Sequence, residues 1–274
     1  MNKRFGAAQP QIKSCDPIWD QVRREAEETS ADEPVLASVI YATILSEPTL
    51  EDAICHTVAN RLQPSVDAGL LHKTFREVLA MEPALGEVFR ADLMAVAKRD
   101  PACRRLLEPL VYFKGFAALA TYRFAHQLWE SGRKDFALFL QSQASRIFGV
   151  DIHPAARLGK GIMLDHATGI VIGETAVIGD NCSLLHGVTL GGTGKERGDR
   201  HPKVGSGVMM GAGAKLLGNI RIGDCVRIAA GSVVLQDVPA RRTVAGVPAR
   251  DIGAAGCEEP ALAMDQLVKD EPCD

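Results

Sequence analysis

The sequence predicts an α + β protein in which a helical N-terminal region is followed by a β-solenoid. Every Phe, Trp and Tyr lies at or before Phe148, whereas 21 of the 26 glycines lie at or after Gly149. Apolar residues recur at helical spacing before this boundary and at every sixth residue after it. We therefore expect a helical domain over residues 1–149, a repeat domain over residues 150–250 and a flexible tail over residues 251–274.

Capping signals delimit the first expected helices. Ser30 and Thr49 each lie three residues before an acidic residue, a spacing that is typical of a helix N-terminus. They precede the apolar-periodic runs 35–45 and 53–62. Prolines separate these runs, because a proline disfavours helical geometry in the residue before it. The spacing predicts a helix in each run.

Further helices are expected up to the boundary. Over residues 88–100, apolar side chains recur at three- and four-residue spacing and so lie on one helical face. This helix must end at Asp100, because Pro101 follows. The runs 115–130 and 133–148 predict an additional pair, and a glycine follows shortly after each run as a C-terminal cap.

A period of six residues governs the second part of the chain. The thirteen positions at this spacing, with a shift of ten residues after Val188, are Ile152, Leu158, Leu164, Ile170, Ala176, Cys182, Val188, Val204, Met210, Leu216, Ile222, Ile228 and Val234. All are small or medium apolar residues, and a solenoid with flat sides of six residues sustains such a period. A β-sandwich, the alternative, would show a period of two. The shift predicts a loop at about residues 193–203 that leaves the solenoid.

The composition favours chemistry on small molecules. With 31 basic and 34 acidic residues, the chain has no overall field that attracts nucleic acid or an anionic membrane. No window approaches the ~20 apolar residues of a membrane span, and the N-terminus lacks the pattern of a signal peptide. We therefore expect a cytoplasmic protein. The seven cysteines form no C-x-x-C pair, which predicts reduced thiols and neither a disulfide framework nor a zinc cluster.

Motifs in the second part carry a resemblance to a known family. They are VDIHPAARLGKGIMLDHATG at 150–169, VIGET at 171–175, VTLGGTG at 188–194, GDRHPK at 198–203 and AGVPAR at 245–250. Together with the helical N-terminal region they closely resemble the bacterial serine O-acetyltransferases, which are hexapeptide-repeat acyltransferases. The resemblance implies a left-handed parallel β-helix that assembles as a trimer or as a dimer of trimers. It also implies acetyl transfer from acetyl-CoA to L-serine, the first step of cysteine biosynthesis.

The resemblance assigns the proton transfer to His166, which occupies the family's catalytic position in LDHATG. An imidazole can accept and return a proton near neutral pH, as a general base must. Asp151 lies fifteen residues earlier, close to one eighteen-residue coil, so we expect it to reach the imidazole and orient it. His153 and His186 also fall in the solenoid, and we interpret both as structural because spacing assigns neither a carboxylate partner.

Substrate contacts are implied by the same resemblance. Asp100 and Asp165 would hold the ammonium group of serine, and Arg200 its carboxylate, because a guanidinium matches two oxygens in one plane. His201 would bind the substrate beside Arg200. The positions that expose backbone to the pantetheine arm of acetyl-CoA are matched by Gly192, Ala212 and Ala230. The reaction requires no metal and no tightly bound cofactor.

The C-terminal region of this family takes part in feedback inhibition by L-cysteine, which competes at the serine pocket. A C-terminal isoleucine of the family also inserts into the partner enzyme O-acetylserine sulfhydrylase. The last residue of this chain is Asp274. We therefore expect inhibition by cysteine and leave a complex with the sulfhydrylase open.

Three other functions share parts of this pattern. Another hexapeptide acyltransferase would share the acetyl-CoA slot but act on a sugar or an antibiotic. A zinc hydratase of the carbonic anhydrase type would need three histidines on one metal. The spacing from His166 to His186 is 20 residues, and the spacing from His186 to His201 is 15 residues. Neither is a whole number of eighteen-residue coils. A non-catalytic scaffold would use the solenoid only for assembly.

Overall fold

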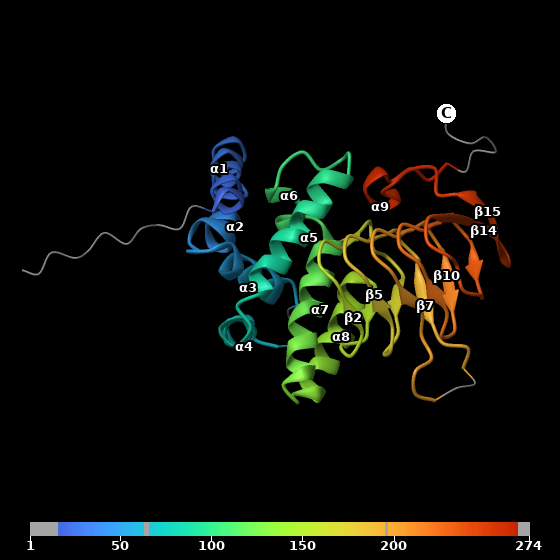
Figure 1. Ribbon diagram of the computed structural model, residues 1–274. Coiled ribbons are helices and arrows are strands. Elements are labelled where there is room, and N and C mark those ends of the chain that lie inside the picture. The colour runs from blue at the N-terminus through green and yellow to red at the C-terminus, as the bar shows by residue number, and fades with distance from the viewer. Residues whose placement is uncertain (1–15, 63–65, 195–196, 268–274) are drawn as a thin grey trace, which may run out of the picture.

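Helices form the first part of the molecule and a triangular β-solenoid the second, as Figure 1 shows. The computed structural model describes residues 16–62, 66–194 and 197–267. The predicted α + β class is confirmed. The helices are α1 (Pro17–Asp32), α2 (Ala37–Ile40), the π-helix η1 (Tyr41–Leu45), α3 (Leu50–Arg61), α4 (Ala68–Met81), α5 (Leu85–Arg99), α6 (Leu107–Val111), α7 (Lys114–Glu130), α8 (Lys134–Phe148) and α9 (Pro260–Ala263).

Local signals explain where several helices begin and end. Thr49 caps α3 as its spacing predicts, because its hydroxyl oxygen accepts a hydrogen bond of 3.1 Å from the N–H of Asp52. Ser30 lies inside α1, so the cap predicted at Ser30 is wrong. Gly149 ends α8 with φ of 68°, a left-handed conformation that favours glycine. Among the described residues, none of the helices combines the length and the apolar character that crossing a bilayer requires.

The solenoid has three faces of parallel strands. Face A contains β1 (Val150–Ile152), β4 (Ile170–Ile172), β7 (Thr189–Gly191), β10 (Lys215–Leu217) and β13 (Val233–Val234). Face B contains β2 (Arg157–Leu158), β5 (Val177–Ile178), β8 (Lys203–Val204) and β11 (Arg221–Ile222). Face C contains β3 (Met163–Leu164), β6 (Ser183–Leu184), β9 (Met209–Met210), β12 (Arg227–Ile228), β14 (Arg242–Gly246) and β15 (Ala249–Ala254). Among these strands, only β15 runs antiparallel to its neighbour, β14.

The six-residue period corresponds to the interior of this solenoid. Twelve of the thirteen repeat positions are buried, and the remaining one, Leu158, is half-buried against the core. Successive coils stack in register, with Val150 opposite Ile170 on face A. Each apolar layer therefore contacts the equivalent layer of the next coil, and no position needs a large ring.

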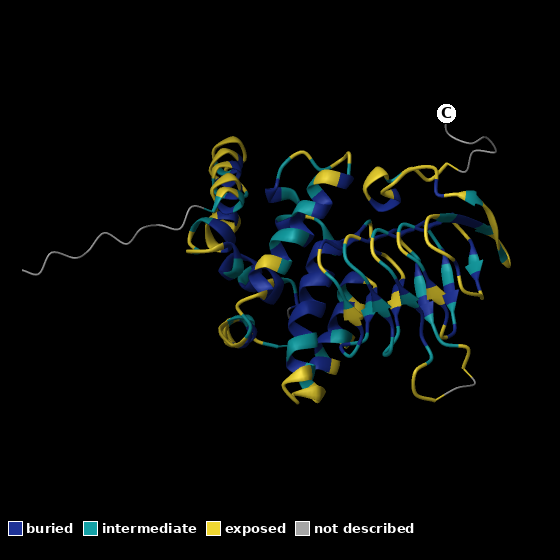
Figure 2. Ribbon diagram, in the orientation of Figure 1, coloured by how far each residue is buried: buried dark blue, intermediate teal, exposed yellow. Residues whose placement is uncertain are grey.

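Two buried charged side chains connect the helical part to the solenoid through hydrogen bonds. The Arg123 guanidinium in α7 donates a hydrogen bond of 2.7 Å to the carbonyl of Leu158 and contacts Asp92 of α5. Asp92 also accepts a hydrogen bond of 2.9 Å from the N–H of Ile162. Figure 2 shows that α7 is buried along much of its length. The helices and the first coil thus share one polar network.

The chain beyond residue 250 packs on the solenoid up to residue 267, which differs from the flexible tail that we expected. The carbonyl of Ala261 in α9 accepts a hydrogen bond of 2.8 Å from the buried hydroxyl of Ser183. Arg227 donates a hydrogen bond of 3.2 Å to the carbonyl of Leu267. These contacts use backbone carbonyls, which no periodicity of side chains reveals. Asp274 lies outside the described residues.

Candidate active site

His166 lies at an exposed turn where β3 of face C leads into β4 of face A, and we call this edge of the solenoid the His166 edge. Its side chain is 78 % exposed, and its Nε2 lies 3.8 Å from Oδ1 of Asp165. His166 and Ala167 have φ of 52° and 60°, a conformation that L-residues other than glycine rarely adopt. Asn181 and Cys225 adopt the same conformation at other turns, so it belongs to the geometry of the solenoid. The turn presents the imidazole to solvent with a carboxylate beside it.

Successive coils repeat this turn along the His166 edge. The N–H of Gly213 donates to the carbonyl of His186, and the N–H of Gly231 donates to the carbonyl of Ala212, both at 2.8 Å. His186, Ala212 and Ala230 each come directly before the glycine of their turn, so the two alanines occupy the position of His186 in later coils. Beyond the two histidines the edge therefore carries small side chains that leave its backbone accessible.

His186 is a neighbour of His166 that the sequence analysis treated as structural. The centroids of the two rings lie 6.1 Å apart, with planes inclined at 67°. His186 is exposed at the next turn of the edge. The twenty-residue interval between them is the signal that could have found this pair, because the first coil of the solenoid has twenty residues, with Met163 opposite Ser183.

Asp100 and Asp165 come from different parts of the chain and act on one another. Burial raises the pKa of the Asp165 carboxyl, the charges of His166 and His186 oppose this increase, and the charge of Asp100 adds to it. Asp100 is the C-terminal cap of α5, where its Oδ1 accepts a hydrogen bond of 2.8 Å from the N–H of Ala102. Two carboxylates and two imidazoles thus share one electrostatic environment.

Asp151 lies on β1 and makes its contact elsewhere. Its Oδ1 accepts a hydrogen bond of 2.6 Å from Nε2 of Gln141 in α8. In the described part of the chain, no hydrogen bond or ion pair joins Asp151 to His166. The expectation assumed an eighteen-residue coil, whereas the register places Asp151 opposite Val171, twenty residues later.

The predicted loop leaves the solenoid between β7 and β8, where face A leads into face B, and we call this edge the Arg200 edge. Figure 1 shows the loop projecting away from the strands. Nη2 of Arg200 donates a hydrogen bond of 2.8 Å to Oε2 of Glu174. This contact holds the pKa of the Glu174 carboxyl below its usual range. A Cβ added at Gly192 would lie 3.4 Å from Cγ of Arg200, so both residues belong to this edge.

Thr175 organises the base of the loop. Its hydroxyl oxygen accepts hydrogen bonds of 3.1 Å from the backbone N–H groups of Arg200 and His201. Nδ1 of His201 in turn accepts a hydrogen bond of 3.2 Å from the N–H of Thr175. Burial and the nearby Arg200 charge lower the pKa of His201. The imidazole is therefore held neutral, with its proton on Nε2.

The predicted site residues divide between the two edges of one chain. The His166 edge and the adjoining end of α5 hold Asp100, Asp165, His166, Ala212 and Ala230, whereas the Arg200 edge holds Gly192, Arg200 and His201. These edges are different corners of the triangular solenoid. One chain therefore does not bring Arg200 to His166. Sequence reasoning also missed Glu174, although VIGET contains it.

Similarity to serine acetyltransferases extends along most of the chain. Residues 18–121 match the family described as "Serine acetyltransferase, N-terminal", and residues 201–236 match "Bacterial transferase hexapeptide (six repeats)". Serine acetyltransferase 4 of Arabidopsis thaliana is 53 % identical over 92 % of this chain and 71 % of its own length.

Solved structures of similar proteins share the fold as well as the sequence. The serine acetyltransferase of Brucella abortus strain S19 in complex with coenzyme A is 58 % identical, with a TM-score of 0.88 over 90 % of this chain and 99 % of that one. A serine acetyltransferase in complex with cysteine is 49 % identical, with a TM-score of 0.90 over 92 % of this chain and 99 % of that one. With such identity over nearly whole chains, this protein belongs to the serine acetyltransferase family.

Proposed function

We propose that this protein transfers the acetyl group of acetyl-CoA to the hydroxyl of L-serine, which yields O-acetyl-L-serine and CoA. The observation that carries the proposal is the pair of carboxylates, Asp100 and Asp165, that share an electrostatic environment with the exposed His166. Two acids suit the ammonium group of an amino acid, whereas a sugar acceptor would not need them. The related Brucella abortus structure contains coenzyme A, which supports the choice of acetyl donor.

His166 acts as general base in this proposal. Its unprotonated nitrogen takes the proton of the serine hydroxyl as the hydroxyl oxygen attacks the thioester carbonyl carbon. The C–S bond then breaks, and the imidazolium returns the proton to the thiolate of CoA. Backbone N–H groups of the solenoid edge are the donors best suited to the oxyanion, since they need no reorganisation. Asp151 remains our candidate for orienting the imidazole, through a rearrangement that would release it from Gln141.

The substrate carboxylate is bound by Arg200 with His201 beside it. Nη2 of Arg200 donates to Glu174 and Nη1 donates at 2.9 Å to the carbonyl of Gly198, which leaves the remaining N–H groups of the guanidinium for a second carboxylate. Acetyl-CoA lies along accessible backbone at Ala212 and Ala230 of one edge and at Gly192 of the other. The division of these residues between two edges supports a site built from two chains.

A cyclic homo-oligomer brings the two edges together. A head-to-tail interface that closes as a trimer places the Arg200 edge of one subunit against the His166 edge of the next. Two trimers would join through their helical domains. The same pocket accommodates L-cysteine as an inhibitor, since cysteine shares both charged groups with serine and a relative has been solved with cysteine bound. A cytoplasmic location stays a prediction from the sequence.

The decisive experiment follows the release of CoA thiol from acetyl-CoA with L-serine, L-homoserine and a galactoside as acceptors. We expect L-serine to support the fastest turnover and L-cysteine to inhibit in competition with it. Faster turnover of the galactoside would contradict the assignment and favour the sugar acetyltransferase.

The role of His166 is tested with His166→Ala, which should lower kcat by roughly 10²–10⁴ because a general base is lost. His126→Ala is the matched control, since its Nδ1 lies 2.7 Å from the Pro154 carbonyl oxygen, outside the proposed site. Turnover by His166→Ala equal to that of the control would remove His166 from the mechanism.

A further inference from the structure

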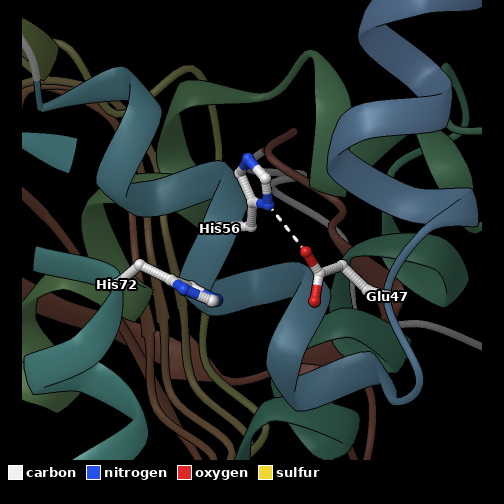
Figure 3. A group of neighbouring side chains, drawn as sticks. All are labelled: Glu47, His56 and His72. Carbon is white, nitrogen blue, oxygen red and sulfur yellow. Dashed lines mark hydrogen bonds and ion pairs between the residues drawn. The ribbon is translucent and has the colours of Figure 1, made fainter. Parts of the chain in front are cut away.

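A cluster of metal-ligating side chains lies in the helical domain, on elements that the proposed reaction does not use. Glu47 lies in the segment between η1 and α3, His56 in α3 and His72 in α4. One ligand atom from each residue lies within 4.8 Å of the other two. Figure 3 shows the three side chains converging, with the His72 ring directed toward the Glu47 carboxylate. The geometry points to a divalent-metal site, and we propose that these three residues bind Zn²⁺.

The His72 ring supplies the strongest argument for a ligand. Its Nε2 is buried and has no hydrogen-bond partner among the residues that the structure describes. Such an atom costs free energy in a folded protein unless something pairs with it. A neutral imidazole has one nitrogen with a free lone pair, which can bind a cation. A cation in the cluster would satisfy this nitrogen.

Glu47 and His56 already form half of the site. Nδ1 of His56 lies 2.7 Å from Oε1 of Glu47, and the centroids of the two imidazole rings lie 5.4 Å apart. In a tetrahedral zinc site with bonds of about 2.1 Å, ligand atoms lie about 3.4 Å apart. Side-chain rotations that move the ligand atoms by about 1 Å would therefore bring the three residues to this spacing. When the metal binds, the proton on Nδ1 of His56 moves to Nε2 of the same ring.

The donor set selects among cations. Two imidazoles and one carboxylate suit Zn²⁺, whereas Mg²⁺ and Ca²⁺ prefer oxygen ligands. The nearby charges are Asp52 and Arg76, and their ion pair of 3.0 Å largely offsets both. Glu47 thus supplies the anionic ligand. Its side chain is 12 % exposed and that of His56 is 29 % exposed, which leaves the metal a path from solvent and room for a water ligand.

The metal would connect α3 and α4 to the segment that precedes α3. Its binding would stabilise the helical domain and is independent of acetyl transfer, so the proposal survives even if the function proposed above is wrong. The exposed pair His166 and His186 is the alternative zinc site that the test must separate.

The test uses the full-length protein after removal of metal by a chelator. Isothermal titration with ZnCl₂ should reveal one tight site per chain, with MgCl₂ as the control that does not bind. His72→Gln should weaken zinc binding by about 100-fold or more, because the loss of an outer-shell partner alone costs 10–100-fold. His186→Gln is the matched control and should leave the tight site intact.

Two further measurements guard against a misfolded variant. Circular dichroism of the metal-free proteins should give the same helix content for the wild type and for His72→Gln. Glu47→Gln keeps the shape of a partly exposed side chain and should also weaken binding. Zinc should raise the Tm of the wild type and of His186→Gln but not that of His72→Gln.

Three results would overturn the proposal. An absence of tight zinc binding by the wild type would leave Glu47 and His56 as a hydrogen-bonded pair only. Unchanged binding by His72→Gln would place the metal elsewhere. Loss of the tight site in His186→Gln would assign it to the His166 edge and favour a metal there instead.

Discussion

Arg123 holds Asp92 through two hydrogen bonds, from Nε to Oδ2 at 3.1 Å and from Nη2 to Oδ1 at 3.3 Å. Their side chains are 7 % and 1 % exposed. Arg123→Met should lower the free energy of unfolding by about 3–5 kcal/mol, because it leaves a buried carboxylate without its counter-ion. Denaturant unfolding measures this change.

The control for Arg123→Met is the same substitution in an exposed pair. Arg242 and Asp251 form an ion pair of 2.7 Å in which each side chain is 41 % exposed. Arg242→Met should change stability little, because solvent screens such pairs. Equal losses from the two variants would show that burial does not govern the Asp92 contact.

Gly115 allows α7 to approach the backbone of the first coil. A Cβ at this position would lie 2.1 Å from the carbonyl oxygen of Leu164, the residue before Asp165. Gly115→Ala should therefore cost about 1–3 kcal/mol of stability, as overpacking does, and lower kcat/KM by displacing the His166 edge. Unfolding curves and steady-state kinetics measure both effects.

Gly69 provides a matched control for Gly115, since each is the second residue of its helix. Within the described residues, a Cβ at Gly69 would meet only the flexible carboxylate of Asp67, at 3.1 Å. Gly69→Ala should be neutral or stabilising by roughly 0.5–1 kcal/mol, the usual gain of alanine in a helix. A comparable loss at both positions would contradict the close approach at Gly115.

The raised pKa of Asp165 predicts a dependence of stability on pH. Because the folded-state pKa lies above the unfolded value, the stabilising effect of protonation is complete below the unfolded pKa and is lost as pH rises through the folded pKa. Asp165→Asn lacks this loss. Its Tm should therefore exceed that of the wild type by a margin that grows as pH rises from about 3 toward 7.

Thermal unfolding at several pH values checks the prediction for Asp165. The matched variant is Asp180→Asn, which removes a carboxylate from the same solenoid at a site where Oδ1 accepts from the N–H of Lys160 at 2.8 Å. That change should lower the Tm, because an amide oxygen is a weaker hydrogen-bond acceptor for the N–H of Lys160 than the carboxylate of Asp180. A margin for Asp165→Asn that shrinks with rising pH would refute the expected direction of the effect.

Thr175 is expected to position the Arg200 edge for serine. Thr175→Val keeps the shape of the side chain but removes the acceptor of two backbone hydrogen bonds. Because an unsatisfied buried donor costs about 1–3 kcal/mol, the KM for L-serine should rise about tenfold or more while kcat changes less. Thr175→Ser should restore the KM, and an unchanged KM in Thr175→Val would argue against this role.

The sequence predicted the solenoid well because its interior is one-dimensional. Each coil contacts only its neighbours, so a strict period of apolar residues specifies the stacking. His166 was predicted differently, from the resemblance of its LDHATG motif to the serine O-acetyltransferases. The period does not encode the length of the turns, however. The first coil contains twenty residues, and this difference separates Asp151 from the position expected for it.

Other features depend on contacts between distant segments. The docking of α9 rests on Ser183 and a backbone carbonyl, and the convergence of Glu47 with His72 depends on how α3 packs on α4. Neither relationship leaves a periodic pattern. The effect of Asp100 on Asp165 likewise arises only when α5 lies against the first coil.

The separation of the two solenoid edges has a consequence for how activity would respond to dilution. Under the proposed assembly a solitary chain carries the base at one edge and the anion receptor at another, so the two do not meet in one site. Turnover per molecule would then fall once the protein becomes scarce enough for subunits to part. Chains disabled at opposite edges could still rescue one another when mixed.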